Sequence, residues 1–167
     1  MAKSVNRPSA IDREHARRVE RIQKQLQCLR LDGLMVFDRT NTFYLTGMQC
    51  SLSYMLVTPR EAVLMVDGRY IEAARQTVRH CDVRLFTNAA RDFTALQKEY
   101  HVQKIGFEGS TPWAEVERWR ELMSGTQWLE NATLIHKLRL IKSASEIKRI
   151  QKSASINDTL CQAAFAM

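Results

Sequence analysis

The sequence predicts an α/β fold in which a mixed β-sheet is flanked by helices and followed by a C-terminal linker helix. Short apolar segments alternate along the chain with longer segments of helical periodicity, which is the pattern of an α/β domain. Two apolar runs, residues 54–58 and 62–66, are separated by a short turn, which favours an antiparallel hairpin. A hairpin within an α/β sheet makes that sheet mixed rather than purely parallel.

The first helix is predicted over residues 9–30. Ser9 and Asp12 form a capping-box-like start, and an Asp-Gly pair after the segment stops it. Residues 34–37 are short, continuously apolar and partly β-branched, which is typical of a strand covered on both faces. The buried face of the helix is predicted to carry Val19, Ile22, Leu26 and Leu29.

The middle of the chain is predicted to continue the alternation of strands and helices. The segment after the first strand is interpreted as a polar turn that runs into Tyr44-Leu45-Thr46-Gly47. Thr111 is expected to cap a helix whose first turn contains Pro112. Further helices are predicted over residues 69–78 and 92–100, and further strands over residues 83–86, 104–107 and 127–129.

The end of the chain is predicted to form a separate segment, which places a boundary between residues 1–136 and residues 137–167. Ser143 and Glu146 form a capping-box pattern, and a helix with apolar residues at near-heptad spacing follows almost to Met167. These apolar residues are Ile147, Ile150, Ala154 and Cys161. Because no later element is present to cover them, we expect this helix to pack against something else.

The net charge of +7 is unevenly distributed. Residues 1–31 hold eight Lys or Arg against three Asp or Glu, and residues 137–152 hold six against one. The rest of the domain is therefore mildly acidic, and we interpret the basic excess as solvated helix faces rather than a nucleic-acid surface. No apolar run approaches the roughly 20 residues of a membrane span. We expect a cytoplasmic protein without a membrane partner.

Side chains that ordinarily form metal or nucleophile sites show no recognised spacing here. The cysteines at 28, 50, 81 and 161 form no CxxC pair, and the four histidines form no HxH or HExxH pattern. The Gly106–Ser110 segment contains two glycines but lacks the lysine of a phosphate-binding loop. The sequence therefore predicts no catalytic residue, no metal and no cofactor within this chain.

Three stretches, in order and spacing, resemble the amino-terminal domain of the creatinase, prolidase and Xaa-Pro aminopeptidase family of metallopeptidases. They are residues 29–34 with Asn41 and Tyr44-Leu45-Thr46-Gly47, then Val66-Asp67-Gly68-Arg69-Tyr70 with Ala73, then Leu138-Arg139-Leu140-Ile141-Lys142-Ser143 with Glu146-Ile147 and Ala154. The third stretch is similar to the linker by which the family's front domain enters the catalytic one. Met48 departs from the pattern, because an aromatic residue commonly follows the Tyr-Leu-Thr-Gly turn.

The resemblance implies a non-catalytic front domain that aids dimerisation and restricts substrate access to a catalytic domain of the pita-bread fold. In such enzymes that second domain holds two divalent metals, commonly manganese, cobalt or zinc, through two Asp, one His and two Glu. Those ligands lie beyond the linker, so none is carried onto this chain. The implied partners are the missing C-terminal catalytic domain, a second copy of the chain, and short proline-containing peptides as substrates of the full enzyme.

Two residues are candidates for contact with substrate or with the other domain. Arg69 follows a strand end, where its guanidinium can pair with a peptide carboxylate, or alternatively with Asp67 or Glu72 nearby. Tyr44 lies in the Tyr-Leu-Thr-Gly turn, and its alternative role is that of a core aromatic with a hydrogen-bonded hydroxyl.

Other functions remain open from the sequence. A stand-alone interaction module with the same fold is one alternative, and a basic nucleic-acid-binding domain is another. A longer reading frame with the Asp, Asp, His, Glu, Glu set supports the front domain of an enzyme, whereas salt-dependent binding of DNA or RNA supports the last alternative.

Overall fold

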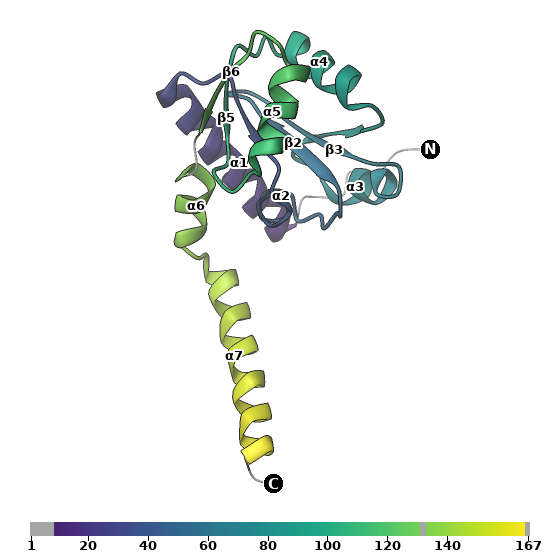
Figure 1. Cartoon of the computed structure of the whole chain (residues 1–167). Coiled ribbons are helices and arrows are strands. Elements are labelled where there is room, and N and C mark those ends of the chain that lie inside the picture. The colour runs from purple at the N-terminus through teal and green to yellow at the C-terminus, as the bar shows by residue number, and fades with distance from the viewer. Residues whose placement is uncertain (1–8, 131–132, 166–167) are drawn as a thin grey trace, which may run out of the picture. The chain divides into compact units, whose positions relative to one another are not determined.

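The computed structural model describes residues 9–130 and 133–165, and it divides into two compact units, Met1–Ile135 and His136–Met167. The first unit holds the sheet and its helices, and the second holds the end of α6 and all of α7 (Figure 1). The predicted end of the last helix near Met167 lies outside the described residues. The elements are α1 (Ala10–Leu29), β1 (Gly33–Val36), α2 (Arg39–Thr46), β2 (Ser53–Val57), β3 (Ala62–Val66), α3 (Ile71–Thr77), β4 (Asp82–Leu85), α4 (Ala89–Glu99), β5 (Lys104–Phe107), α5 (Trp113–Leu122), β6 (Gln127–Glu130), α6 (Thr133–Leu140) and α7 (Ala144–Phe165).

The six described strands form one mixed sheet, which confirms the predicted fold class. Their order is β4-β3-β2-β1-β5-β6. Strand β2 is antiparallel to both β1 and β3, and the other neighbouring pairs are parallel. The predicted hairpin is the β2–β3 pair, in which Val57 lies opposite Ala62. Because β2 alone runs in the opposite direction, the carboxyl ends of the five other strands meet at one edge of the sheet.

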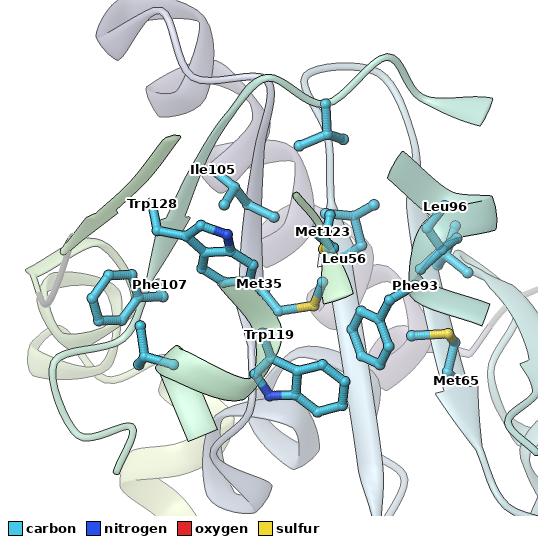
Figure 2. Close-up of a cluster of buried hydrophobic side chains, with 13 residues drawn as sticks. Met35, Leu56, Met65, Phe93, Leu96, Ile105, Phe107, Trp119, Met123 and Trp128 are labelled. Carbon is cyan, nitrogen blue, oxygen red and sulfur yellow. The ribbon is translucent and has the colours of Figure 1, made fainter. Parts of the chain in front are cut away.

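One face of the sheet is covered by α4 and α5, and α1 lies on the other side (Figure 1). Alternation along β1 directs Met35 toward α5, where it joins a buried cluster with Phe93 and Trp119 (Figure 2). The adjacent Leu34 and Val36 are also fully buried. Both faces of the central strand are therefore covered, as its unbroken apolar sequence predicted.

Helix α1 confirms the predicted capping box. The Ser9 hydroxyl accepts from the Asp12 amide at 3.1 Å, and the Ser9 amide donates to the Asp12 carboxylate at 2.8 Å. Three of the four predicted core residues on this helix are buried, but Leu29 is 48% exposed. The prediction for Leu29 was wrong because the helix ends at that residue and Arg30 turns the chain away in a left-handed conformation.

Two other local predictions were also wrong. The segment read as a polar turn before Tyr44 is helix α2, which begins because the Asp38 carboxylate accepts from the Asn41 amide at 2.9 Å. Thr111 does not cap α5, because the N-cap residue is Pro112 and the Thr111 hydroxyl is buried without a partner in the described chain. Helix α6 continues into the residues interpreted as a linker and ends at Leu140.

The predicted start of the last helix is confirmed. The Glu146 amide donates to the Ser143 hydroxyl at 3.2 Å, and the Ser143 amide donates to the Glu146 carboxylate at 2.8 Å. None of the described residues of α7 is buried, and the side chains of Ile147, Ile150 and Leu160 are exposed. The domain boundary that the sequence predicts between residues 136 and 137 stays a prediction.

Candidate functional site

Tyr44 and Arg69, the two candidates from the sequence, lie in segments that follow the carboxyl ends of two strands. Helix α2, which carries Tyr44, follows the carboxyl end of β1, and the turn that carries Arg69 follows the carboxyl end of β3. Both strands are antiparallel to β2, so they run in the same direction. The fold thus places both candidate residues beyond the carboxyl ends of these strands, where α/β proteins commonly present functional loops.

Arg69 forms a local polar cluster at the surface. Its Nη2 and Nε donate to the Asp67 carboxylate at 2.7 Å and 3.1 Å, and its Nη2 also lies 3.1 Å from the Ser51 hydroxyl. The Tyr70 hydroxyl donates to the same serine oxygen at 3.2 Å. The Arg69 side chain is still 68% exposed. Hydrogen bonding from Arg69 holds the pKa of Asp67 below its ordinary value, so the carboxylate stays charged beside the guanidinium.

This geometry leaves two roles open to Arg69. The contact with Asp67 is the nearby ion pair that sequence reasoning gave as the alternative to a binding role. A surface pair of this kind contributes little to stability because the Arg69 charge is largely solvated. Asp67 therefore holds the Arg69 side chain in one orientation. The exposed N–H groups of the guanidinium can still bind another carboxylate.

Tyr44 lies in the last turn of α2 and is held from α1. The Arg18 guanidinium carbon lies 4.0 Å from the centre of the half-buried Tyr44 ring, a cation–π contact. Arg18 Nη1 also donates to the Tyr44 carbonyl at 2.6 Å, and Arg18 forms an ion pair with Glu14. The ring and the backbone of Tyr44 are thus fixed by one side chain.

Two histidines complete the contacts around this turn. His15 Nδ1 lies 2.9 Å from the Tyr44 carbonyl, and His80 Nε2 lies 2.9 Å from the Leu45 carbonyl. A carbonyl oxygen only accepts, so each contact is a hydrogen bond in the tautomer whose facing nitrogen carries the proton, and His15 Nδ1 also lies 3.3 Å from Arg18 Nη1. The rings are stacked with centroids 6.1 Å apart and planes at 12°. We refer to His15, Arg18 and His80 as the α2 clamp.

The clamp satisfies a physical need of the helix. The last carbonyls of a helix lack partners within it, and they carry the negative end of its dipole. The clamp supplies three N–H donors from two segments distant in sequence. Gly47 ends the helix with φ of 73°, and a Cβ at this position would lie 2.8 Å from His15 Nε2. Only glycine therefore fits both the backbone conformation and the close approach of the imidazole.

Sequence reasoning considered His15 and His80 only as metal ligands and Arg18 only as a surface charge. Helical spacing held a signal for two of them, because residues 15, 18, 19, 22 and 26 share one face of α1. His80 had no such signal, because it reaches α2 from a loop after α3. Across the described part of the chain, no three His, Cys, Asp or Glu side chains come together in a way that could hold a metal ion.

The polar groups of this part of the sheet suit binding. Arg69 offers a cation and Tyr44 offers a phenol. Within residues 9–130 and 133–165, no helix combines the length and the apolar character needed to cross a membrane.

Comparison with known proteins shows the family to which this chain is similar. The family described as Creatinase/Prolidase N-terminal domain matches residues 18–141. The uncharacterized peptidase YqhT of Bacillus subtilis is 27% identical over 143 residues, which cover 84% of this chain and 40% of that protein. The Xaa-Pro dipeptidase of Pyrococcus horikoshii is 26% identical over 136 residues, which cover 81% and 38%. This chain thus spans about two fifths of the length of these curated relatives.

A solved structure shows the same fold. The Xaa-Pro dipeptidase from Bacillus anthracis matches with a TM-score of 0.85 at 22% identity, over 91% of this chain and 43% of that chain. Because the first unit holds about four fifths of the residues, the match extends into the second unit. The resemblance inferred from three sequence stretches is confirmed. With the family match covering about three quarters of its length, this protein belongs to the creatinase/prolidase N-terminal domain family.

Proposed function

We propose that this chain is the non-catalytic front domain of a Xaa-Pro aminopeptidase or dipeptidase, and that it aids dimerisation and restricts access of substrates to a separate catalytic domain. The observation that carries the proposal is the family match over residues 18–141, in a chain that spans about two fifths of its curated relatives. Short proline-containing peptides are the proposed substrates of the complete enzyme. Two divalent metals, manganese, cobalt or zinc, belong in this proposal to the catalytic domain.

The test compares this chain with the product of a longer reading frame. The longer protein is expected to hydrolyse Xaa-Pro dipeptides or the amino-terminal bond of Xaa-Pro tripeptides, and the 167-residue chain is expected to be inactive under the same conditions. A dipeptide without proline serves as the control substrate. Hydrolysis by the 167-residue chain would contradict the proposal, and the absence of a longer reading frame would favour a stand-alone interaction module.

A contact with the catalytic domain is proposed from the exposed side chains of α7. Ile147, Ile150 and Leu160 are apolar and exposed along a helix with no buried residue in its described length. Such a helix ordinarily gains stability by packing its apolar side chains against another element. We propose that in the complete enzyme the catalytic domain packs against these side chains. The dimer is then formed by the whole protein.

Light scattering separates the contributions of the two parts. The longer protein is expected to have the mass of a dimer, and hydrogen exchange in α7 is expected to be slower there than in the 167-residue chain. Exchange in β1 serves as the internal control, because that strand is buried in either protein. A monomeric longer protein, or equally fast exchange in α7, would contradict the proposed assembly.

Arg69 is proposed to contact the carboxylate of the peptide or an acidic group of the catalytic domain. In the longer protein, Arg69→Ala is expected to lower kcat/KM for a Xaa-Pro dipeptide about tenfold, since losing one hydrogen bond to a charged group costs about 1.5 kcal/mol. Arg75→Ala is the matched control, because Arg75 also forms an exposed ion pair, 3.3 Å from Glu72. Equal kcat/KM values for Arg69→Ala and Arg75→Ala would show that Arg69 does not make the proposed contact.

Tyr44 is proposed for the same contact surface. Tyr44→Phe tests its hydroxyl and keeps the ring that lies over Arg18. The cytoplasmic location is a further proposal, which is checked by fractionating cells that express the untagged protein.

A further inference from the structure

The centre of the sheet contains a topological switch point. Strands β1 and β5 are parallel neighbours, with Met35 opposite Phe107. The chain leaves β1 toward β2 on one side, and it leaves β5 toward β6 on the other. In open α/β sheets the connections diverge at such a place, and ligands bind there beyond the carboxyl ends of the strands.

In this chain a side chain of the protein occupies that place. Glu108 directly follows β5 and is only 5% exposed. Its Oε2 accepts from the amides of Phe37 and Asp38 at 2.7 Å and 2.9 Å, and its Oε1 accepts from Asn41 Nδ2 at 2.5 Å. Both carboxylate oxygens are therefore bound by donors from the end of β1 and the start of α2.

The donors have the arrangement of an anion site. Two successive backbone amides that point at one oxygen, beside the first turn of a helix, form the kind of concavity that binds phosphates and carboxylates in other proteins. Among the described residues no cation forms an ion pair with Glu108. The carboxylate is thus held by neutral N–H groups, as a bound small anion would be.

We propose that the backbone of Phe37 and Asp38, together with Asn41, forms a carboxylate-binding site at the switch point, and that the chain's own Glu108 is its resident ligand. A small carboxylate such as formate occupies the site when the Glu108 side chain is removed. The internal ligand joins β5 to β1 and fixes the first turn of α2, the helix whose last turn carries Tyr44. Glu108 is in this sense a positioning residue for the candidate contact surface.

Chemical rescue distinguishes a bound carboxylate from a side chain that only fills space. Glu108→Ala in the 167-residue chain is expected to lower Tm, and sodium formate is expected to raise that Tm saturably above the value in sodium chloride of equal ionic strength. The wild type and Glu130→Ala are expected to respond alike to the two salts. Glu130 is the matched control because it ends the neighbouring parallel strand β6 and is exposed.

The outcome that overturns the proposal is a formate response in Glu108→Ala no larger than that of the control. Should Glu108→Ala fail to fold, Glu108→Gln provides the second test. Glutamine keeps the shape but offers an NH2 group to one of three N–H donors, so a lower Tm and faster exchange of the Phe37 and Asp38 amides are expected. Unchanged Tm and exchange in Glu108→Gln would equally overturn the proposal.

Discussion

Replacing Trp119 with alanine is expected to lower the free energy of unfolding by about 3 to 5 kcal/mol, the range for truncating a large aromatic residue in a packed core. The Trp119 side chain is fully buried between α5 and the sheet (Figure 2). Its ring centroid lies 3.9 Å from that of Phe93, 5.1 Å from that of Tyr54 and 5.9 Å from that of Phe37. Removing it leaves these rings around a cavity that they cannot close.

The measurement is urea denaturation followed by far-ultraviolet circular dichroism, because tryptophan fluorescence would change with the substitution itself. Trp113→Ala is the matched control, since Trp113 begins the same helix and is 63% exposed. Its only described ring contact is with Arg120 at 5.4 Å, so a change within about 0.5 kcal/mol is expected. A loss below 1 kcal/mol for Trp119→Ala would show that this cluster is not the centre of the core.

Trp119→Phe refines the same result. The Trp119 indole N–H is buried and has no acceptor in the described chain, which offsets part of the stability that the ring contributes. Phenylalanine removes this donor and keeps a ring against Phe93. The variant is therefore expected to lose much less stability than Trp119→Ala in the same denaturation experiment.

The sheet was predictable because its strands have local signals. Residues 62–66 are apolar at every position and form β3 with the predicted bounds, and β5 also matches its predicted range. The short turn between β2 and β3 leaves only an antiparallel pairing for those two strands. The capping boxes at Ser9 and Ser143 lie within four residues of chain, so their reciprocal hydrogen bonds could also be read from the sequence.

The missed features depend on contacts between distant residues. Helix α2 is short and has few apolar residues, so periodicity gave no signal, although Asp38 and Gly47 have the residue types of a helix start and stop. His80 reaches the Leu45 carbonyl from 35 positions away, and Glu108 reaches the amide of Phe37 from 71 positions away. Such contacts follow from strand order, which a single sequence without homologues does not specify.

Acidification from pH 7 to pH 5 is expected to destabilise the protein through the α2 clamp. Burial lowers the pKa of His15 and of His80 below the ordinary value of 6.5, and the charge of Arg18 acts in the same direction on His15. The unfolded chain therefore binds more protons than the folded chain below about pH 6.5. Stability falls with pH in that window and is fully present above it. Protonation also places two stacked cations beside a guanidinium at the carbonyls of α2.

Other titrating groups either lie outside this window or oppose the effect. Hydrogen bonds lower the pKa of Asp12 and Asp67, so these carboxylates lose their contribution only below about pH 4. Burial raises the pKa of Glu108, so the folded chain takes up a proton there before the unfolded chain does, and this stabilises the protein on acidification. The negative charges of Asp12 and Glu14 also raise the pKa of His15 and moderate its shift.

A difference between variants isolates the histidine contribution from that of Glu108. The double variant His15→Gln/His80→Gln is expected to be less stable at pH 7 and to lose the decline in urea midpoint between pH 7 and pH 5, because glutamine donates to a carbonyl but does not titrate there. His101→Gln/His136→Gln is the matched control, since it removes the two other histidines, both exposed. It is expected to keep the wild-type decline. An identical decline in the two double variants would place the acid sensitivity outside the clamp, and an identical change of midpoint in the wild type and the His15→Gln/His80→Gln variant would mean that protonation costs the stacked pair nothing.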